Sequence, residues 1–192
     1  MRKTNSYEKD IEKAAKYIAK MDSLLLHRDG ENVYISDGHF LVKIQDCLYN
    51  TFFRPVSSRF IPLADGDRAG VQNNKKALPE LNPKGANLQK CAPCVYESGY
   101  VEAVKVPFKA ESRDGKDLNI FETGDELTYI NSEYWQALQC LFTSDIYSKG
   151  RKFGIASNFD DMTAAFILPV NYQAASRFEI VNTEKLDMRK YA

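Results

Sequence analysis

Long apolar runs are missing from this sequence. A helix that spans a bilayer needs about 20 consecutive apolar residues, and no run in the 192-residue chain approaches that length. The N-terminal sequence MRKTNSYEKD leads directly into charged residues and lacks the apolar stretch of a secretory signal peptide. We therefore expect a cytoplasmic protein with no membrane partner, and we expect its four cysteines to be reduced thiols.

A net charge of either sign is missing as well. The 26 basic residues are balanced by 26 acidic residues, so no global field attracts nucleic acid, and DNA binding would need a local basic patch. Hydrophobic residues make up 44% of the chain and aromatic residues 12%, which is typical of a folded protein with a substantial core. The length suits one large domain or two small halves.

The common signatures of catalysis are also missing. The sequence contains no G-x-S-x-G nucleophile elbow, P-loop, dinucleotide-binding fingerprint or EF-hand loop. Paired carboxylates such as Asp160 and Asp161 fall in turns, where aspartate is favoured for backbone reasons. We therefore predict that the protein is not an enzyme and that it has no cofactor.

The sequence has one C-x-x-C motif, Cys91-Ala92-Pro93-Cys94, which could bind zinc or carry out thiol chemistry. A structural zinc site needs four ligands, usually as two such pairs, whereas Cys47 and Cys140 stand alone. A redox motif ordinarily begins a helix, whereas the residues after Cys94 look extended. We predict no metal site and keep Cys91 and Cys94 as the weak candidates for one.

The first predicted element is a helix over residues 7–22. Its apolar residues repeat at helical spacing and define one buried face, made of Ile11, Ala14, Ala15, Ile18 and Met21. Four lysines, spaced four, three and four residues apart, form a stripe on the same helix: Lys9, Lys13, Lys16 and Lys20. Such a stripe could contact phosphates in a salt-sensitive way that ignores base sequence, or it could be an ordinary solvated face with i,i+4 ion pairs.

A β-hairpin is predicted over residues 33–45, with Asp37-Gly38 as a type I′ turn between two alternating strands. His39 follows the turn and neighbours Asp37, so an acid–histidine pair is one interpretation. We favour a simpler one, a polar residue at the start of a strand, because the sequence offers no accompanying nucleophile.

Residues 46–98 form the least regular part of the sequence, with five prolines and several turn-forming pairs. We expect an insertion or a functional loop here, with short strands near 50–54 and 58–63. Aromatic residues are interleaved with Arg54 and Arg59, a mixture that can stack on bases or anchor a partner. We favour a place in the core or at an interface for these aromatic residues, which are Tyr49, Phe52, Phe53 and Phe60.

Regular structure returns after residue 100. Strands are predicted over 100–108, 118–122, 126–130, 153–157 and 162–170, with an edge strand at 178–181. A second helix is predicted to begin at Asn131 or Ser132. Its polar face carries Glu133, Gln136 and Gln139 but no basic residue, and positive charge returns beyond its end at Lys149, Arg151 and Lys152.

One order of elements occurs twice along the chain. Residues 7–45 read as a helix followed by paired strands, and residues 126–170 as a strand, a helix and paired strands. The pattern predicts an α+β fold, in which an antiparallel sheet carries helices on one face and is arranged as two βαβββ-like halves. We expect a single α+β domain at residues 1–175, with an irregular insertion at about 46–98, and a C-terminal edge strand or tail at residues 176–192.

Three stretches resemble bacterial DNA sliding clamps, the beta subunit of DNA polymerase III. ISDGHFLVKI resembles the clamp strand–turn–strand sequence T-D-G-H-R-L, although Phe40 replaces the usual basic residue. YINSEYWQALQCLF resembles the passage from strand to helix, and KFGIASNFDDMTAAFILPVNY resembles the closing hairpin. Such clamps are built from β-α-β-β-β units, two per domain, with helices facing the DNA channel and sheets outside. Residues 46–98 have no counterpart in them.

The resemblance implies a non-enzymatic, clamp-like module that acts near double-stranded DNA, in replication or on a mobile element. The phosphate contacts would come from the two basic groups, Lys9, Lys13, Lys16 and Lys20 together with Lys149, Arg151 and Lys152. Because one domain cannot enclose DNA, the resemblance also implies a closed homo-oligomer. Two other functions stay open: an adaptor that binds protein partners without nucleic acid, and a cysteine- or metal-dependent enzyme that uses residues 46–98.

Overall fold

The computed structural model contains two antiparallel sheets and a layer of helices. It describes residues 6–112, 115–143, 145–170 and 179–182. No helix in these ranges is both long enough and apolar enough to cross a membrane.

The first helix, α1 (Ser6–Ile18), leads into three consecutive antiparallel strands, β1 (Leu24–Asp29), β2 (Asn32–Ser36) and β3 (Phe40–Gln45). Leu26 lies opposite Ile35, and Ile35 lies opposite Val42. Directly opposed residues share one face of a sheet, so these three side chains all point into the core beneath α1.

The turn between β2 and β3 differs from the predicted type I′ turn. That turn needs positive φ at both central residues, whereas Gly38 has φ +97° and Asn73 is the one non-glycine residue of the described chain with positive φ. The Asp37 Oδ1 atom instead accepts hydrogen bonds from the backbone N–H groups of His39 at 2.7 Å and Phe40 at 3.2 Å. A side chain, and not the backbone alone, therefore closes this turn.

Residues 46–53 are helical, so the strand predicted near 50–54 is wrong. Helix α2 (Asp46–Leu48) continues into the π-helical turn η1 (Tyr49–Phe53). The strand predicted near 58–63 is wrong too, because these residues form turns and irregular backbone. Tyr49 and Phe53 are one helical turn apart and are at most 1% exposed. Their burial in the core outweighs the β preference of aromatic residues. The predicted core position is confirmed for Tyr49, Phe53 and Phe60, whereas Phe52 is only partly buried.

The rest of the chain supplies the outer strands and the second helix. Strands β4 (Arg68–Val71) and β5 (Glu80–Leu81) and the 3₁₀ turn η2 (Gln89–Cys91) follow η1. Next come β6 (Val101–Glu102), β7 (Val104–Glu111), β8 (Asp117–Thr123) and β9 (Glu126–Asn131). After helix α3 (Ser132–Leu138) and the 3₁₀ turn η3 (Gln139–Leu141), the chain forms β10 (Tyr147–Ser148), β11 (Ile155–Ala156), β12 (Thr163–Ile167) and β13 (Glu179–Asn182).

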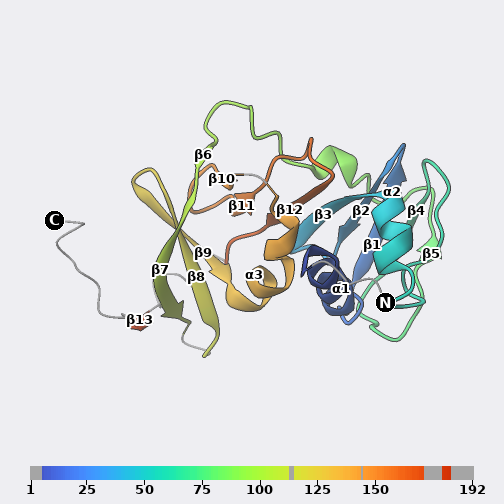
Figure 1. The fold of residues 1–192 in the computed structure, drawn as a ribbon, viewed down its shortest axis with the longest axis horizontal. Helices are drawn as coiled ribbons and strands as arrows, with labels where there is room; N and C mark the ends of the chain where they lie inside the picture. The colour runs from blue at the N-terminus through green and yellow to red at the C-terminus, as the bar shows by residue number, and fades with distance from the viewer. Residues whose placement is uncertain (1–5, 113–114, 144, 171–178, 183–192) are drawn as a thin grey trace.

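The strands form a nine-stranded sheet in the order β5-β4-β1-β2-β3-β12-β11-β10-β6 and a four-stranded sheet in the order β13-β7-β8-β9. Helices α1 and α3 contact each other and lie side by side in front of the strands, with the smaller sheet at the left of the view (Figure 1). Strand β12 brings a late part of the sequence beside an early part, because its five residues pair with β3 from Phe40 to Ile44.

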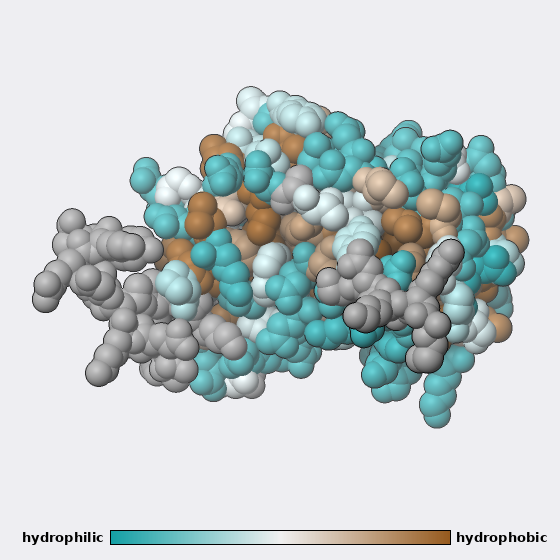
Figure 2. Space-filling model, in the orientation of Figure 1, coloured by the Kyte–Doolittle hydropathy of each residue, from teal (hydrophilic) through white to brown (hydrophobic). Residues whose placement is uncertain are grey.

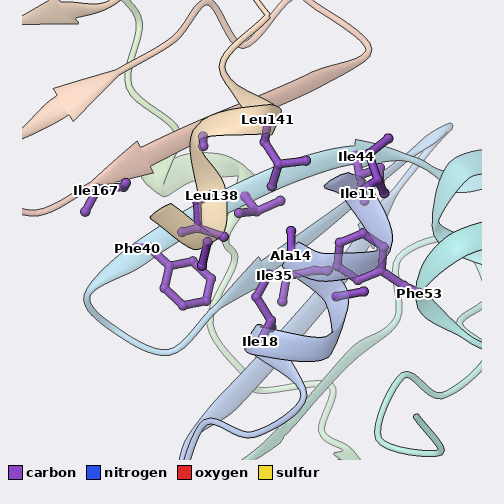
Figure 3. Close-up of a cluster of buried hydrophobic side chains, with 14 of the residues drawn as sticks. Ile11, Ala14, Ile18, Ile35, Phe40, Ile44, Phe53, Leu138, Leu141 and Ile167 are labelled. Carbon is purple, nitrogen blue, oxygen red and sulfur yellow. The ribbon is translucent and has the colours of Figure 1, made fainter. Parts of the chain in front are cut away.

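One hydrophobic core lies between the helices and the larger sheet. Helix α1 contributes four fully buried residues, Ile11, Ala14, Ala15 and Ile18. Leu138 and Leu141 come from the α3 side and belong to the same cluster as Ile35, Phe40 and Ile167 of the strands (Figure 3). The predicted α+β class is confirmed, including the placement of both helices over one face of an antiparallel sheet. The domain boundary at residue 175 stays a prediction.

Candidate functional site

The lysine stripe lies on the solvent side of α1. Lys9, Lys13 and Lys16 are exposed on α1, opposite the fully buried Ile11 and Ile18, and Lys20 is exposed in the turn that follows the end of the helix. At 1.5 Å of rise per residue, the helical part of the stripe, from Lys9 to Lys16, extends for about 10 Å. The sequence pattern therefore identified a continuous row of exposed ammonium groups.

Acidic residues of α1 moderate the charge of this row. Lys16 Nζ lies 2.5 Å from Glu12 Oε1, with the two side chains 60% and 44% exposed. An exposed i,i+4 pair of this kind contributes about 0.3–0.5 kcal/mol, so an anionic ligand could displace Glu12 from Lys16. Glu8 and Asp10 lie on the same helix. The positive potential of α1 is therefore local to the row itself.

Helix α3 packs beside α1 through aromatic side chains. The rings of Tyr17 and Tyr134 meet edge to face with centroids 6.1 Å apart. Burial, Glu133 and Asp37 together raise the pKa of Tyr17 to about 12. Burial likewise raises the pKa of Cys140, which follows α3, to about 11; Asp10 of α1 adds to this rise and Lys13 of α1 opposes it. The two helices thus form one layer, in which α1 supplies the positive charge.

The second predicted basic group lies elsewhere, in the loop between β10 and β11. Lys149 Nζ bonds Glu97 at 3.0 Å and lies 4.5 Å from the centre of the Tyr100 ring. The backbone N–H of Arg151 donates to Glu126 at the start of β9, and Lys152 is exposed. The structure therefore does not join Lys149, Arg151 and Lys152 to the α1 row in one surface. DNA binding by either group stays a prediction.

Asp37 connects the hairpin turn to α3. The hydroxyl of Tyr134 donates to Asp37 Oδ2 at 3.0 Å, and the Asp37 side chain is only 6% exposed. Burial and the Asp37 carboxylate raise the pKa of Tyr134 above its ordinary value. His39, by contrast, is 71% exposed, with its Nδ1 atom 4.0 Å from Asp37, and its ring stacks on Tyr134. Asp37 is thus engaged by the turn and by α3.

Replacing Tyr134 with phenylalanine should lower the free energy of unfolding by about 1.5 kcal/mol, because Asp37 loses a hydrogen bond to a largely buried carboxylate oxygen. Urea unfolding of Tyr134→Phe would measure the loss. Tyr96→Phe is the matched control, since Tyr96 is 71% exposed and its hydroxyl bonds Asn158 at the surface; its change should stay within about 0.5 kcal/mol. Equal losses in the two variants would contradict a role for the Asp37–Tyr134 bond.

The cysteine motif lies on the opposite side of the larger sheet from α1. Cys91 and Cys94 are both exposed free thiols, and Cys91 Sγ lies 3.5 Å from the carbonyl oxygen of Asn87. Across the ranges that the structure describes, no group of three or more His, Cys, Asp or Glu side chains gathers in a way that could hold a metal ion. The motif therefore adds nothing that favours the metal-dependent alternative.

Sequence reasoning missed a groove beside the lysine row. It has a volume of about 440 Å³ and lies between α1 and the end of η1, lined by Glu12, Lys16, Thr51, Phe52, Pro55 and Val56. The signal for it was the four-residue spacing of Leu48, Phe52 and Val56, which fits a helical stretch. Neighbouring aromatic residues and Pro55 made the same segment look extended.

Exposed apolar side chains mark a second surface. Tyr96, Val101, Val104, Leu127 and Phe153 are between 40% and 71% exposed. Figure 2 shows hydrophobic side chains gathering towards the upper left of the molecule, over β6, β10 and the smaller sheet. Strand β6 is also the last strand of its sheet. Such features are typical of protein contacts.

Comparison with known proteins gives little further information. No protein-family model matches the chain, and no curated protein matches it. A solved structure named "Caulobacter crescentus pol III beta" matches 95% of this chain and 67% of its own, at 10% sequence identity and a TM-score of 0.35. This is a weak resemblance at the level of the fold, and it supports no inference about function.

Proposed function

We propose that this chain is a non-enzymatic binding module whose helix layer contacts the phosphate backbone of double-stranded DNA. The observation that carries the proposal is the position of Lys9, Lys13 and Lys16, which are exposed on α1 opposite its buried face, with Lys20 exposed just beyond the end of the helix. A straight row of ammonium groups contacts phosphates without reading bases. Binding would therefore be independent of sequence and sensitive to salt, as suits a module that acts along DNA in replication or on a mobile element.

The proposal includes a symmetric homo-oligomer. A single chain presents one helix layer, which can cover one side of a duplex but cannot surround it. Closed rotational symmetry would place several such layers around a common axis, with the lysine rows facing the DNA. Protein partners would then bind elsewhere on the surface.

The test is the salt dependence of duplex binding, measured by fluorescence anisotropy. Each phosphate neutralised contributes about 0.9 to the slope of log K against log salt concentration. Replacing all four lysines of the row with glutamine should therefore reduce the slope by about 3 to 4, and should weaken binding most at low salt.

A matched control removes the same charge from another surface. Lys75, Lys76, Lys84 and Lys90 are also exposed and lie well apart from α1 in the sequence, so their replacement by glutamine should leave the slope within about 1 of the unchanged protein. Equal effects of the two quadruple variants, or no DNA affinity at low salt in the unchanged protein, would overturn the proposal.

A protein–protein adaptor is the second candidate function. The exposed apolar side chains near β6 favour it, because large apolar side chains at a sheet edge are more common in protein contacts than in DNA contacts. In this case the α1 row would be a solvated helix face, and binding to duplex DNA would be absent at every salt concentration.

A further inference from the structure

A row of polar side chains crosses the outer face of the larger sheet, opposite the helices. The strand register places Arg68 of β4 opposite His27 of β1, His27 opposite Tyr34 of β2, and Tyr34 opposite Lys43 of β3. His27, Tyr34 and Lys43 are only 2%, 6% and 5% exposed. Basic side chains are seldom buried so deeply, so the segments that cover this row determine its chemistry.

Two segments cover the row. Residues 82–96, which we call the strap, contribute Leu88 and Ala92 to a small apolar cluster with Tyr34 and Leu41, and Phe159 comes from the turn before β12. The cations at the two ends of the row hold these covers in place. Arg68 Nη1 donates to the carbonyl oxygen of Gly85 in the strap at 3.1 Å, and Lys43 Nζ donates to the carbonyl oxygen of Phe159.

His27 lies next to Arg68 in this row, where only its neutral form is well accommodated. Within the described part of the chain, His27 Nδ1 and Arg68 Nε are buried and have no hydrogen-bond partner. Burial and Arg68 lower the pKa of His27, and these effects outweigh the opposing effects of Asp29 on β1 and Asp65 in the loop before β4. The two lysines of the strap, Lys84 and Lys90, are exposed and bring no negative charge.

We propose that His27 is an acid-sensitive latch: when it gains a proton beside Arg68, the strap detaches from the outer face and uncovers Tyr34, Leu41 and Leu88. Two cations on adjacent strands repel each other, and the repulsion is stronger where burial limits their contact with water. When the strap moves away, water can reach the side chains of both His27 and Arg68 and weaken this repulsion. The helix layer on the opposite face keeps its packing, so the latch changes one surface of the protein and leaves the other intact.

The direction of the pH dependence follows from linkage. The pKa of His27 in the folded protein lies below its ordinary value of 6.5, so the covered state binds fewer protons than the open state. The stability of the covered state is fully present above pH 6.5 and decreases as the pH falls towards the pKa of the folded protein. Free carboxylates titrate mostly below this window.

Hydrogen exchange measured by mass spectrometry at pH 7.5 and pH 5.0 tests the latch, after correction for the intrinsic pH dependence of exchange. Protection of the strap should fall by up to about tenfold per pH unit below 6.5, while α1 remains protected. In His27→Gln and His27→Phe, which cannot gain the proton, strap protection should be the same at both pH values.

His39→Gln is the matched control, since His39 is the other histidine of the sequence and its side chain is 71% exposed. This variant should lose strap protection at pH 5.0 as the unchanged protein does. Three results would each overturn the latch. The first is strap protection in the unchanged protein that is the same at both pH values. The second is a loss of strap protection at pH 5.0 in the two His27 variants that equals the loss in the unchanged protein, and the third is a parallel loss of protection in α1, which would show global unfolding.

Discussion

Replacing Gly154 with alanine should destabilise the protein by about 3–5 kcal/mol, which is at the upper end of the range for single substitutions. A Cβ atom at this position would lie 2.1 Å from the carbonyl oxygen of Ile167 and 3.0 Å from the Cα of Leu168. Both neighbours belong to the backbone, so no side-chain rotation can relieve the contact. Gly154 also has φ +77°, a conformation that side-chain-bearing residues rarely adopt.

The effect should spread because Ile167 is a central position in the larger sheet. Ile167 pairs with Ile155 on β11 and with Phe40 on β3, so a shift of its carbonyl group disturbs two strand pairs at once. Gly124→Ala is the matched control, because Gly124 also has positive φ, +57°, but nothing lies within 4 Å of its added Cβ. Its cost should be about 1 kcal/mol from backbone conformation alone. Chemical denaturation of both variants measures the difference, and equal losses would contradict the steric explanation.

Hydrophobic periodicity made both helices predictable from the sequence. Of the predicted apolar face of the first helix, Ile11, Ala14, Ala15 and Ile18 are fully buried. The helix ends at Ile18, before its predicted end at residue 22, so Met21 lies beyond it and is only partly buried. The cap of α3 could also be read directly, since Asn131 Oδ1 accepts a hydrogen bond from the N–H of Glu133 at 2.8 Å. Both signals are local, because they depend on residues within one or two helical turns.

The parts that could not be predicted depend on distant contacts. Strand β12 pairs with β3 across more than a hundred residues of sequence, and no local pattern in one sequence indicates which strands become neighbours. The same reason explains the error at residues 46–53. The aromatic residues there suit a strand by intrinsic preference, but Tyr49 and Phe53 are buried against Phe60 in the core that α1 shares.

In the candidate site, too, local features could be predicted from the sequence and contacts between distant residues could not. Spacing alone predicted the exposed row, because helical geometry places Lys9, Lys13 and Lys16 on one side of α1, and Lys20 is exposed just beyond the end of the helix. It could not predict that Lys149 would bond Glu97, nor that Lys43 and His27 would be buried under loops. Those placements come from the sheet order and from the path of the strap.

Arg59 shows how an apparently functional pattern can be structural, and its replacement with methionine should cost about 3–4 kcal/mol. The side chain is 4% exposed. Its Nη1 atom donates to the carbonyl oxygens of Ala19 at 2.9 Å and Met21 at 2.5 Å, just beyond the end of α1. Its Nε atom donates to the carbonyl oxygen of Ala77 at 3.2 Å. Arg59 therefore satisfies carbonyl groups from two segments and places positive charge at the negative end of α1.

Methionine keeps most of the volume of arginine but donates no hydrogen bonds, so buried carbonyl oxygens would be left without a partner. Arg54→Met is the matched control, since Arg54 is exposed and bonds the side chain of Asn50 at 3.0 Å; its change should stay within about 0.5 kcal/mol. Arg59→Lys should give an intermediate loss, because one ammonium group cannot reproduce the planar set of donors that reaches both segments. Urea unfolding would rank the three variants. A loss in Arg59→Met as small as that in Arg54→Met would show that the end of α1, and with it the position of Lys20, does not depend on this guanidinium group.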